Sequence, residues 1–260
     1  MSCTRRLVFC LTLALAVLQG RAAENKKDEK KKEPPKITGA VPFAVVPGVT
    51  NKIKIRGLNL TNATEVRFPG ATTTPIAEIK SRGKATLPDK ADPKKLGDTQ
   101  LEVELILPAD FQAGDLPFSV TTPDGDTNTN LLRVVEGKLL FDEKEPNGGF
   151  RNPNDIRLPQ TIRGTIDPAN DVDVFRFTGR AGQKIRIESL SGRFGSTLDP
   201  ILSLHDAAGH PLATSDDTKD GLDARIQFTL PRGGSYFISI IDAHDRGGPT
   251  YGYLVTVSAE

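Results

Sequence analysis

Short segments in which apolar and polar residues alternate are the feature that most constrains this chain. In residues 101–107 the odd-numbered positions are Leu or Val, and Glu102 and Glu104 lie between them. The same period of two recurs in residues 184–188 and 225–230. Such alternation is typical of strands with one face buried and the other in water. Because 19 prolines and 24 glycines punctuate these segments, the pattern predicts an all-β fold of short strands and turns.

The first residues predict export. Arg5 and Arg6 precede an apolar segment, residues 7–18, and small residues follow at positions 20, 22 and 23. This order is typical of a secretory signal peptide, which we place at residues 1–22. The apolar segment is too short for a stable transmembrane helix. We therefore expect no membrane span and an exported protein, located in the periplasm, on the cell surface or outside the cell.

Export affects both the covalent stabilisation and the charge of the chain. Cys3 and Cys10 are the only cysteines, and both lie in the predicted signal peptide, so disulfides are not expected in the exported chain. Loss of residues 1–22 removes three arginines and no acidic residue, so the formal net charge changes from +1 to −2. This balance argues against nucleic acid as a partner, since nucleic-acid-binding domains are basic.

Residues 23–36 mix lysines with acidic residues and contain no large apolar side chain. A segment of this composition cannot bury a core, so it predicts a disordered charged spacer. Contact of its lysines with a membrane surface or a polymer is the alternative, although the interleaved acidic residues weaken the positive field. The remainder of the chain has the length of two ordinary domains.

The first domain is expected at residues 37–136. Its motifs are ITGAVP at 37–42, IKIRGLN at 53–59 and FSVTTPDG at 118–125, followed by Asn128. Together they resemble the TIG/IPT type of immunoglobulin-like domain. The resemblance implies a β-sandwich that acts as a spacer or an interaction module.

The alternation also places the strands of this domain. The segment 71–97 is rich in Lys, Pro and Thr and is longer than such a domain needs, so we expect an elaborated loop there. Strands are expected at residues 52–56, 65–68, 101–107, 117–120 and 131–135.

The second domain is expected at residues 137–260, after a break in the pattern near Gly137. Its motifs resemble the bacterial pre-peptidase C-terminal domain. The resemblance implies a jelly-roll-like β-sandwich of the kind appended to secreted proteases, similar to the calcium-binding, collagen-binding domains of bacterial collagenases. The motifs are EPN at 145–147, GTI at 164–166, DVDVFRF at 171–177, AGQ at 181–183, LDP at 198–200, LHDAAG at 204–209, DD at 216–217, FTLP at 228–231 and GGSY at 233–236.

Acidic and amide side chains gather at strand ends in this second domain, as a Ca²⁺ site requires. Position by position, the resemblance implies that the Ca²⁺ ligands are Glu143, Glu145, Asn147, Asp171 and Asp173. The alternative is that the glutamates are linker charges, that the asparagine caps a turn and that the aspartates complete a loop.

Two residues depart from the family pattern near these ligands. Gly148 stands where members with a well-formed site often have Asp, and Val174 replaces a large aromatic residue. Both departures bear on how well the chain holds Ca²⁺. A second acidic segment, residues 215–223, resembles the start of an EF-hand loop, but Gln227 stands where that loop requires Glu, so an exposed hairpin loop is expected instead.

The residues give little support for catalysis. His205, His210 and His244 are the only histidines, and their spacing matches no zinc motif. The segment SGRFG at 191–195 is not a nucleophile elbow, and no thiol remains after export. We therefore expect that the protein is not an enzyme. The catalytic alternative that stays open is a pair of carboxylates like that of a glycoside hydrolase.

Tyrosines near the C-terminus offer a second candidate site. Tyr251 and Tyr253 lie on one face of the expected last strand, so both belong to the core or both are exposed. The core is the favoured interpretation. If exposed, they would form an aromatic platform with Arg246 and His244 that suits a polymer chain or a peptide.

These observations predict a secreted, non-catalytic module for adhesion or substrate targeting, stabilised by Ca²⁺. The expected partner is an extracellular protein or a polysaccharide. The first alternative is an accessory or inhibitory subunit of an exported hydrolase, and the second is a glycoside hydrolase or other hydrolase in its own right.

Overall fold

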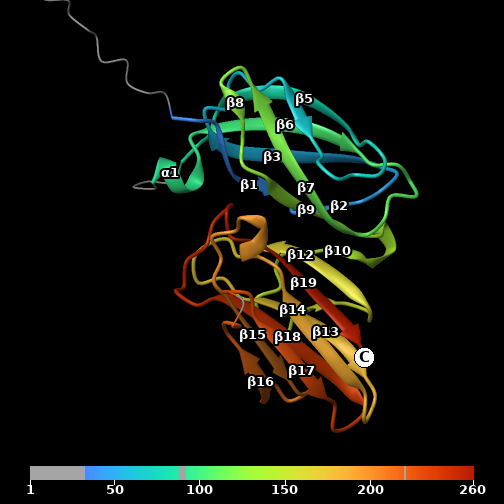
Figure 1. The fold of residues 1–260 in the computed structure, drawn as a ribbon. Helices are drawn as coiled ribbons and strands as arrows, with labels where there is room; N and C mark the ends of the chain where they lie inside the picture. The colour runs from blue at the N-terminus through green and yellow to red at the C-terminus, as the bar shows by residue number, and fades with distance from the viewer. Residues whose placement is uncertain (1–32, 88–91, 220) are drawn as a thin grey trace, which may run out of the picture. The chain divides into compact units, whose positions relative to one another are not determined.

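The computed structural model describes residues 33–87, 92–219 and 221–260 (Figure 1). The predicted signal peptide and most of the charged spacer lie outside these ranges, so both stay predictions. Within them the chain is nearly all β, which confirms the expected fold class. No helix of the described residues is long and apolar enough to cross a membrane.

Residues 36–134 form two β-sheets that enclose one apolar core. The first sheet contains, in spatial order, β1 (Lys36–Val41), β3 (Thr50–Leu58), β6 (Thr99–Ile106) and β5 (Ile76–Lys84). The second contains β2 (Ala44–Val45), β9 (Asn130–Val134), β7 (Gly114–Thr122) and β4 (Glu65–Arg67), with β8 (Gly125–Asp126) paired to β7. In β6 the odd-numbered positions are buried and Glu102 is exposed, as the alternation predicts.

The prediction of a loop over residues 71–97 is wrong, because the segment contains β5 and a short helix, α1 (Pro93–Leu96). Strand β5 pairs with β6 through a register shift between Ile79 and Ser81. It is an edge strand with mostly exposed side chains. An exposed edge strand lacks the buried apolar face that makes strands recognisable in a sequence.

Residues 140–259 form a second pair of sheets. The first contains β10 (Leu140–Asp142), β12 (Gln160–Thr165), β19 (Gly252–Ala259), β14 (Lys184–Ser189) and β17 (Arg225–Thr229). The second contains β11 (Asn154–Asp155), β13 (Asp173–Gly179), β18 (Gly234–Asp242), β15 (Pro200–His205) and β16 (Pro211–Ser215). We call this pair the C-terminal sandwich. Ile185 and Val255 from one sheet and Phe175 and Ile238 from the other share its core.

Two 3₁₀ helices, η1 (Gly137–Leu139) and η2 (Gly192–Phe194), complete the described elements. In the described ranges each sheet uses strands from one side of η1 only, but residues 33–260 form one compact unit. Phe43 stacks on Phe194 at 6.0 Å between ring centroids, within a third apolar cluster that includes Val135 and Leu254. The predicted division into two domains near Gly137 therefore stays a prediction.

Candidate metal site

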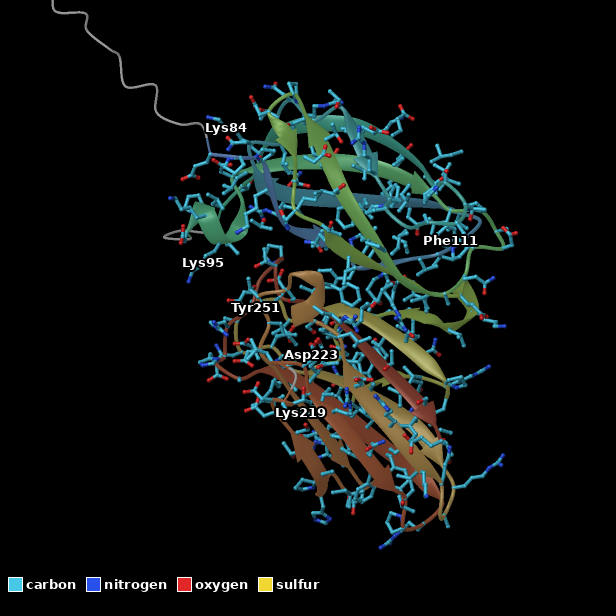
Figure 2. The ribbon with its side chains drawn as sticks, in the orientation of Figure 1. Lys84, Lys95, Phe111, Lys219, Asp223 and Tyr251 are labelled. Atoms are coloured by element: carbon cyan, nitrogen blue, oxygen red, sulfur yellow. The ribbon has the colours of Figure 1, made fainter. Side chains whose placement is uncertain are left out.

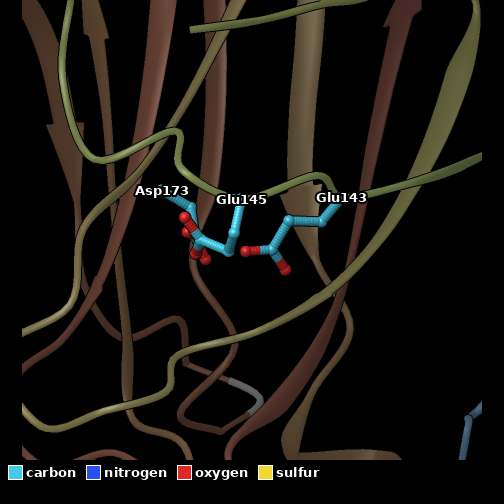
Figure 3. A group of neighbouring side chains, drawn as sticks. All are labelled: Glu143, Glu145 and Asp173. Atoms are coloured by element: carbon cyan, nitrogen blue, oxygen red, sulfur yellow. The ribbon is translucent and has the colours of Figure 1, made fainter. Parts of the chain in front are cut away.

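Three carboxylates from two parts of the chain converge beside β13. Glu143 and Glu145 lie in the segment between β10 and β11, and Asp173 is the first residue of β13. One oxygen of each lies within 4.8 Å of the others, and Figure 3 shows the three side chains directed toward one another. Asp173 is fully buried, whereas Glu145 is exposed. We call these three residues the acidic cluster.

Backbone pairing fixes two of these side chains. The N–H of Glu143 donates to the carbonyl of Arg163 at 3.0 Å, which continues the pairing of β10 with β12. The Glu143 Oε2 accepts a hydrogen bond from the N–H of Thr165 at 2.7 Å. Asp173 pairs with Ile240 of β18. It is the first residue of β13, a strand in which most residues are buried.

Asn147 closes the cluster. It is fully buried, its N–H donates to Glu145 Oε2 at 2.9 Å, and its carbonyl accepts from the N–H of Val174 at 3.1 Å. With the amide nitrogen directed inward, it donates to Asp173 Oδ1 at 2.9 Å and to Glu145 Oε2 at 3.1 Å. With the amide oxygen inward, that oxygen faces only acceptors. The second orientation suits a cation held between amide and carboxylate oxygens.

Tyr253 reaches the same group from β19. Its hydroxyl donates to Asp173 Oδ2 at 2.8 Å, and the ring is fully buried. Gly164 of β12 lies beside it, and a Cβ at this glycine would overlap with Glu143 Oε2 and the Tyr253 hydroxyl. A side chain at position 164 would therefore displace two members of the site.

Burial sets the electrostatics of the cluster. It raises the pKa of Asp173 to about 9, with the charge of Glu143 adding to the effect. It also raises the pKa of Glu143, and the pKa of the Tyr253 hydroxyl lies well above its usual value. These directions follow because negative charge is costly in a buried site to which the described part of the chain brings no cationic partner. A bound cation would favour the charged carboxylates instead.

The side chains of the acidic cluster are of the kind that binds a metal ion. Glu143 Oε1 is buried and has no hydrogen-bond partner among the described residues. Carboxylate and amide oxygens are the ligands that hard cations such as Ca²⁺ and Mg²⁺ prefer, whereas zinc and copper favour nitrogen and sulfur ligands. The acidic cluster could thus hold a metal ion.

The structure brings four of the five predicted ligands together and places the fifth, Asp171, differently. The Asp171 carboxylate accepts from the N–H groups of Asp167, at 3.0 Å, and of Val172, at 2.9 Å. It thus stabilises the turn before β13 instead of joining the three converging oxygens. The contact between Tyr253 and Asp173 was not predicted, since a period of two assigns a face of a strand and not a partner.

A second group of carboxylates was also missed. Oxygens of Asp199, Asp216 and Asp217 lie within 4.8 Å of one another. Burial and the two neighbouring charges raise the pKa of Asp199, and His244 Nδ1 lies 3.3 Å from its Oδ2. The pairing of β15 with β16 brings these residues together, because Asp199 precedes the first strand and Asp216 follows the second. We call these three residues the aspartate group.

The exposed aromatic platform is not formed. Tyr253 is fully buried because β19 lies between β12 and β14 and its hydroxyl finds Asp173 inside. Tyr251, labelled in Figure 2, directly precedes β19 and is half-buried, packed against the same core. The Arg246 guanidinium lies 5.8 Å from its ring centroid and pairs with Asp242. The favoured interpretation, a core position, therefore holds for Tyr253.

The architecture and the site define an all-β module with a cluster of carboxylates that could hold a metal ion. Residues 171–241 match the family model of the bacterial pre-peptidase C-terminal domain, so this part of the C-terminal sandwich is a domain of that family, as its motifs predicted. The resemblance of the first domain to the TIG/IPT type stays a prediction.

Individual proteins also match parts of this chain. A probable subtilase-type serine protease from Deinococcus radiodurans is 44% identical over 49% of this chain, which spans 22% of that relative's length. The pre-peptidase C-terminal domain of a Bacillus anthracis collagenase is 19% identical, with a TM-score of 0.35 over 45% of this chain and 100% of that domain. The periplasmic g-type lysozyme inhibitor of Aeromonas hydrophila is 16% identical, with a TM-score of 0.31 over 42% of this chain and 99% of the inhibitor.

Proposed function

We propose that this chain is an exported, non-catalytic binding module whose C-terminal sandwich is stabilised by Ca²⁺ and which attaches to an extracellular protein or polysaccharide. The observation that carries the proposal is the convergence of Glu143, Glu145 and Asp173 around the buried Asn147. The match of residues 171–241 to a domain family of exported proteins supports the location.

The chain's own residues explain why a cation would stabilise the fold. Glu143 and Glu145 belong to the segment that enters the sandwich, and Asp173 is the first residue of β13. Bound Ca²⁺ supplies positive charge that offsets the mutual repulsion of these carboxylates. The entering segment is then tied to β13 through Glu145, Asn147 and Asp173, so binding energy adds to folding stability.

Calorimetric titration of Ca²⁺ into the full chain, with thermal melts alongside, tests this proposal. We expect one tight site that is lost in Glu145→Gln and kept in the matched control Glu136→Gln, an exposed glutamate paired with Lys138. At a Ca²⁺ concentration of a hundred times Kd, the stabilisation should be about 2.7 kcal/mol. A silent titration and an unchanged melting temperature would contradict a role for Ca²⁺.

A second candidate function is an accessory or inhibitory subunit of an exported hydrolase. The relative named as a probable subtilase-type serine protease favours it, because 49% of this chain aligns with part of that protein. Addition of the full chain to a subtilisin-type protease should then change peptide hydrolysis or form a complex in size-exclusion chromatography. An unchanged rate and separate elution would count against this alternative.

A further inference from the structure

The outward face of the sheet β11-β13-β18-β15-β16 carries residues that the metal site does not use. The inward residues of these strands belong to the core of the C-terminal sandwich. Alternation therefore directs Arg176, Phe237 and His205 outward, and the strand register places these three side by side. They form the middle of the outward face.

Phe150 covers this part of the face from the loop that follows Asn147. Its ring centroid lies 5.1 Å from that of Phe237 and 4.9 Å from that of His205, both in edge-to-face geometry. Phe150 also packs over Gly209, where a Cβ would lie 3.4 Å from its ring. The Phe150 side chain is 42% exposed, whereas Phe237 beneath it is 7% exposed. Phe150 thus offers an aromatic surface that is fixed from below and open to solvent.

A row of neutral polar groups lies beside this ring. Ser203 is the register partner of both Ser239 and Thr214. The hydroxyls of Ser203 and Thr214 are 3.1 Å apart, and the Ser239 hydroxyl lies 3.1 Å from Nε2 of His205. The row therefore crosses three neighbouring strands and ends at the ring cluster. None of these three hydroxyl residues is fully buried.

The charge of Arg176, in the middle of this face, is compensated within the face. Both terminal oxygens of Asp155 accept hydrogen bonds from Arg176, at 2.6 and 2.8 Å. Burial lowers the pKa of His205, so the imidazole is neutral at pH 7. A face of this kind complements a neutral ligand, because an acidic or basic polymer would call for unpaired charges of opposite sign.

We propose that this face binds a neutral polysaccharide, with a sugar ring stacked on Phe150 and sugar hydroxyls bonded to the row of Ser203, Ser239 and Thr214. The inference rests on the binding function proposed above and names its ligand class. An exposed aromatic ring beside fixed hydroxyl groups matches the alternation of apolar C–H faces and hydroxyl edges in a sugar chain.

The loop that carries Phe150 is anchored by residues of the metal site. The N–H of Gly149 donates to the Asn147 carbonyl at 2.8 Å, and Asn152 Nδ2 donates to the Pro146 carbonyl at 3.1 Å. Asn147 also holds β13 through Val174. Ca²⁺ at the acidic cluster should therefore strengthen polysaccharide binding by ordering the loop.

Affinity gel electrophoresis of the full chain tests the proposal, with gels that contain amylose, mixed-linkage β-glucan, galactomannan or gelatin. We expect retardation by at least one of the three neutral polysaccharides, and more of it with Ca²⁺ than with a chelator. Phe150→Ala should weaken binding about tenfold, whereas Phe150→Tyr should keep it. Ile76→Ala, at an exposed apolar residue of β5, is the matched control. Thermal melts establish that each variant is folded, and Ser239→Ala serves as a second variant.

The outcomes separate this inference from the proposed function. Retardation that is equal in Phe150→Ala, Ser239→Ala and the unaltered chain places the ligand elsewhere and overturns the assignment of this face. Retardation by gelatin alone overturns the ligand class and leaves the binding function standing. Retardation by none of the four polymers also overturns the ligand class, and together with a silent Ca²⁺ titration it removes the proposed function as well.

Discussion

The acidic cluster and the aspartate group contain the same number of carboxylates but differ in their surroundings. In the acidic cluster, a fully buried Asp173 meets Glu143, Asn147 and Tyr253, all of which present oxygen or amide groups. In the aspartate group, Asp216 and Asp217 are exposed, and His244 lies 3.3 Å from Asp199.

The two groups differ in what offsets the negative charge of their carboxylates. Water relieves the repulsion in the aspartate group, because Asp216 and Asp217 are exposed and exposed carboxylates are well screened. In the acidic cluster Asp173 is fully buried, and no cationic side chain of the described residues forms an ion pair with it, so a proton or a metal ion must neutralise it. The number of acidic residues is therefore a poorer guide to a metal site than burial without a cationic partner.

The largest expected effect concerns pH. In the metal-free protein, Asp173 has a pKa of about 9, raised from an ordinary value of 3.8. A carboxyl whose folded-state pKa is raised binds its proton more tightly when folded, so its contribution to stability is full below the unfolded pKa and is lost as pH rises through the folded one. Between pH 6 and 8 the free energy of unfolding should fall by up to about 1.4 kcal/mol per pH unit.

Denaturant melts from pH 6 to pH 9 in a chelator check this slope. Asp173→Asn should flatten it, because the amide resembles the protonated acid. Saturating Ca²⁺ should reverse it, since metal binding favours deprotonated ligands. A flat profile in the unaltered, metal-free chain would show that the cluster is not buried as described.

A smaller effect is expected at Gly148, where the chain departs from the family pattern. A Cβ there would lie 3.4 Å from the Val172 carbonyl, which is close to ordinary contact. Gly148→Asp should therefore fit and add one carboxylate near the acidic cluster, which increases the charge available to Ca²⁺. We expect roughly tenfold tighter binding in calorimetry, with Gly149→Asp as the control one position further along. Weaker or unchanged binding would mean that position 148 points away from the ligands.

The alternation of apolar and polar residues predicted much of this fold, and it failed for a strand that has no buried face. The four buried positions of residues 101–107 lie where the period of two places them. Strand β5 was missed because its side chains face solvent. Of the candidate ligands, Asp171 could not be separated from its neighbours in the sequence, because a backbone turn captures its carboxylate.

The aspartate group shows the same limit for contacts between distant residues. Asp199 and Asp216 meet only because β15 and β16 pair, with Leu202 opposite Ser215. A hairpin assigned to residues 200–215 would have predicted that its two ends lie together. The burial of Asp199 relative to its exposed neighbours depends on tertiary packing, which a local pattern does not contain.

The smallest expected effect concerns the aspartate group. Because Asp216 and Asp217 are exposed, the double variant Asp216→Asn with Asp217→Asn should change the free energy of unfolding by less than about 0.5 kcal/mol. It should also leave the number of Ca²⁺ ions bound per chain at one, since removing charge from a screened group frees no buried carboxylate. Calorimetric stoichiometry measures this directly. A fall from two ions to one in the double variant would show that the aspartate group binds Ca²⁺ despite its exposure, and burial would then no longer distinguish the two groups.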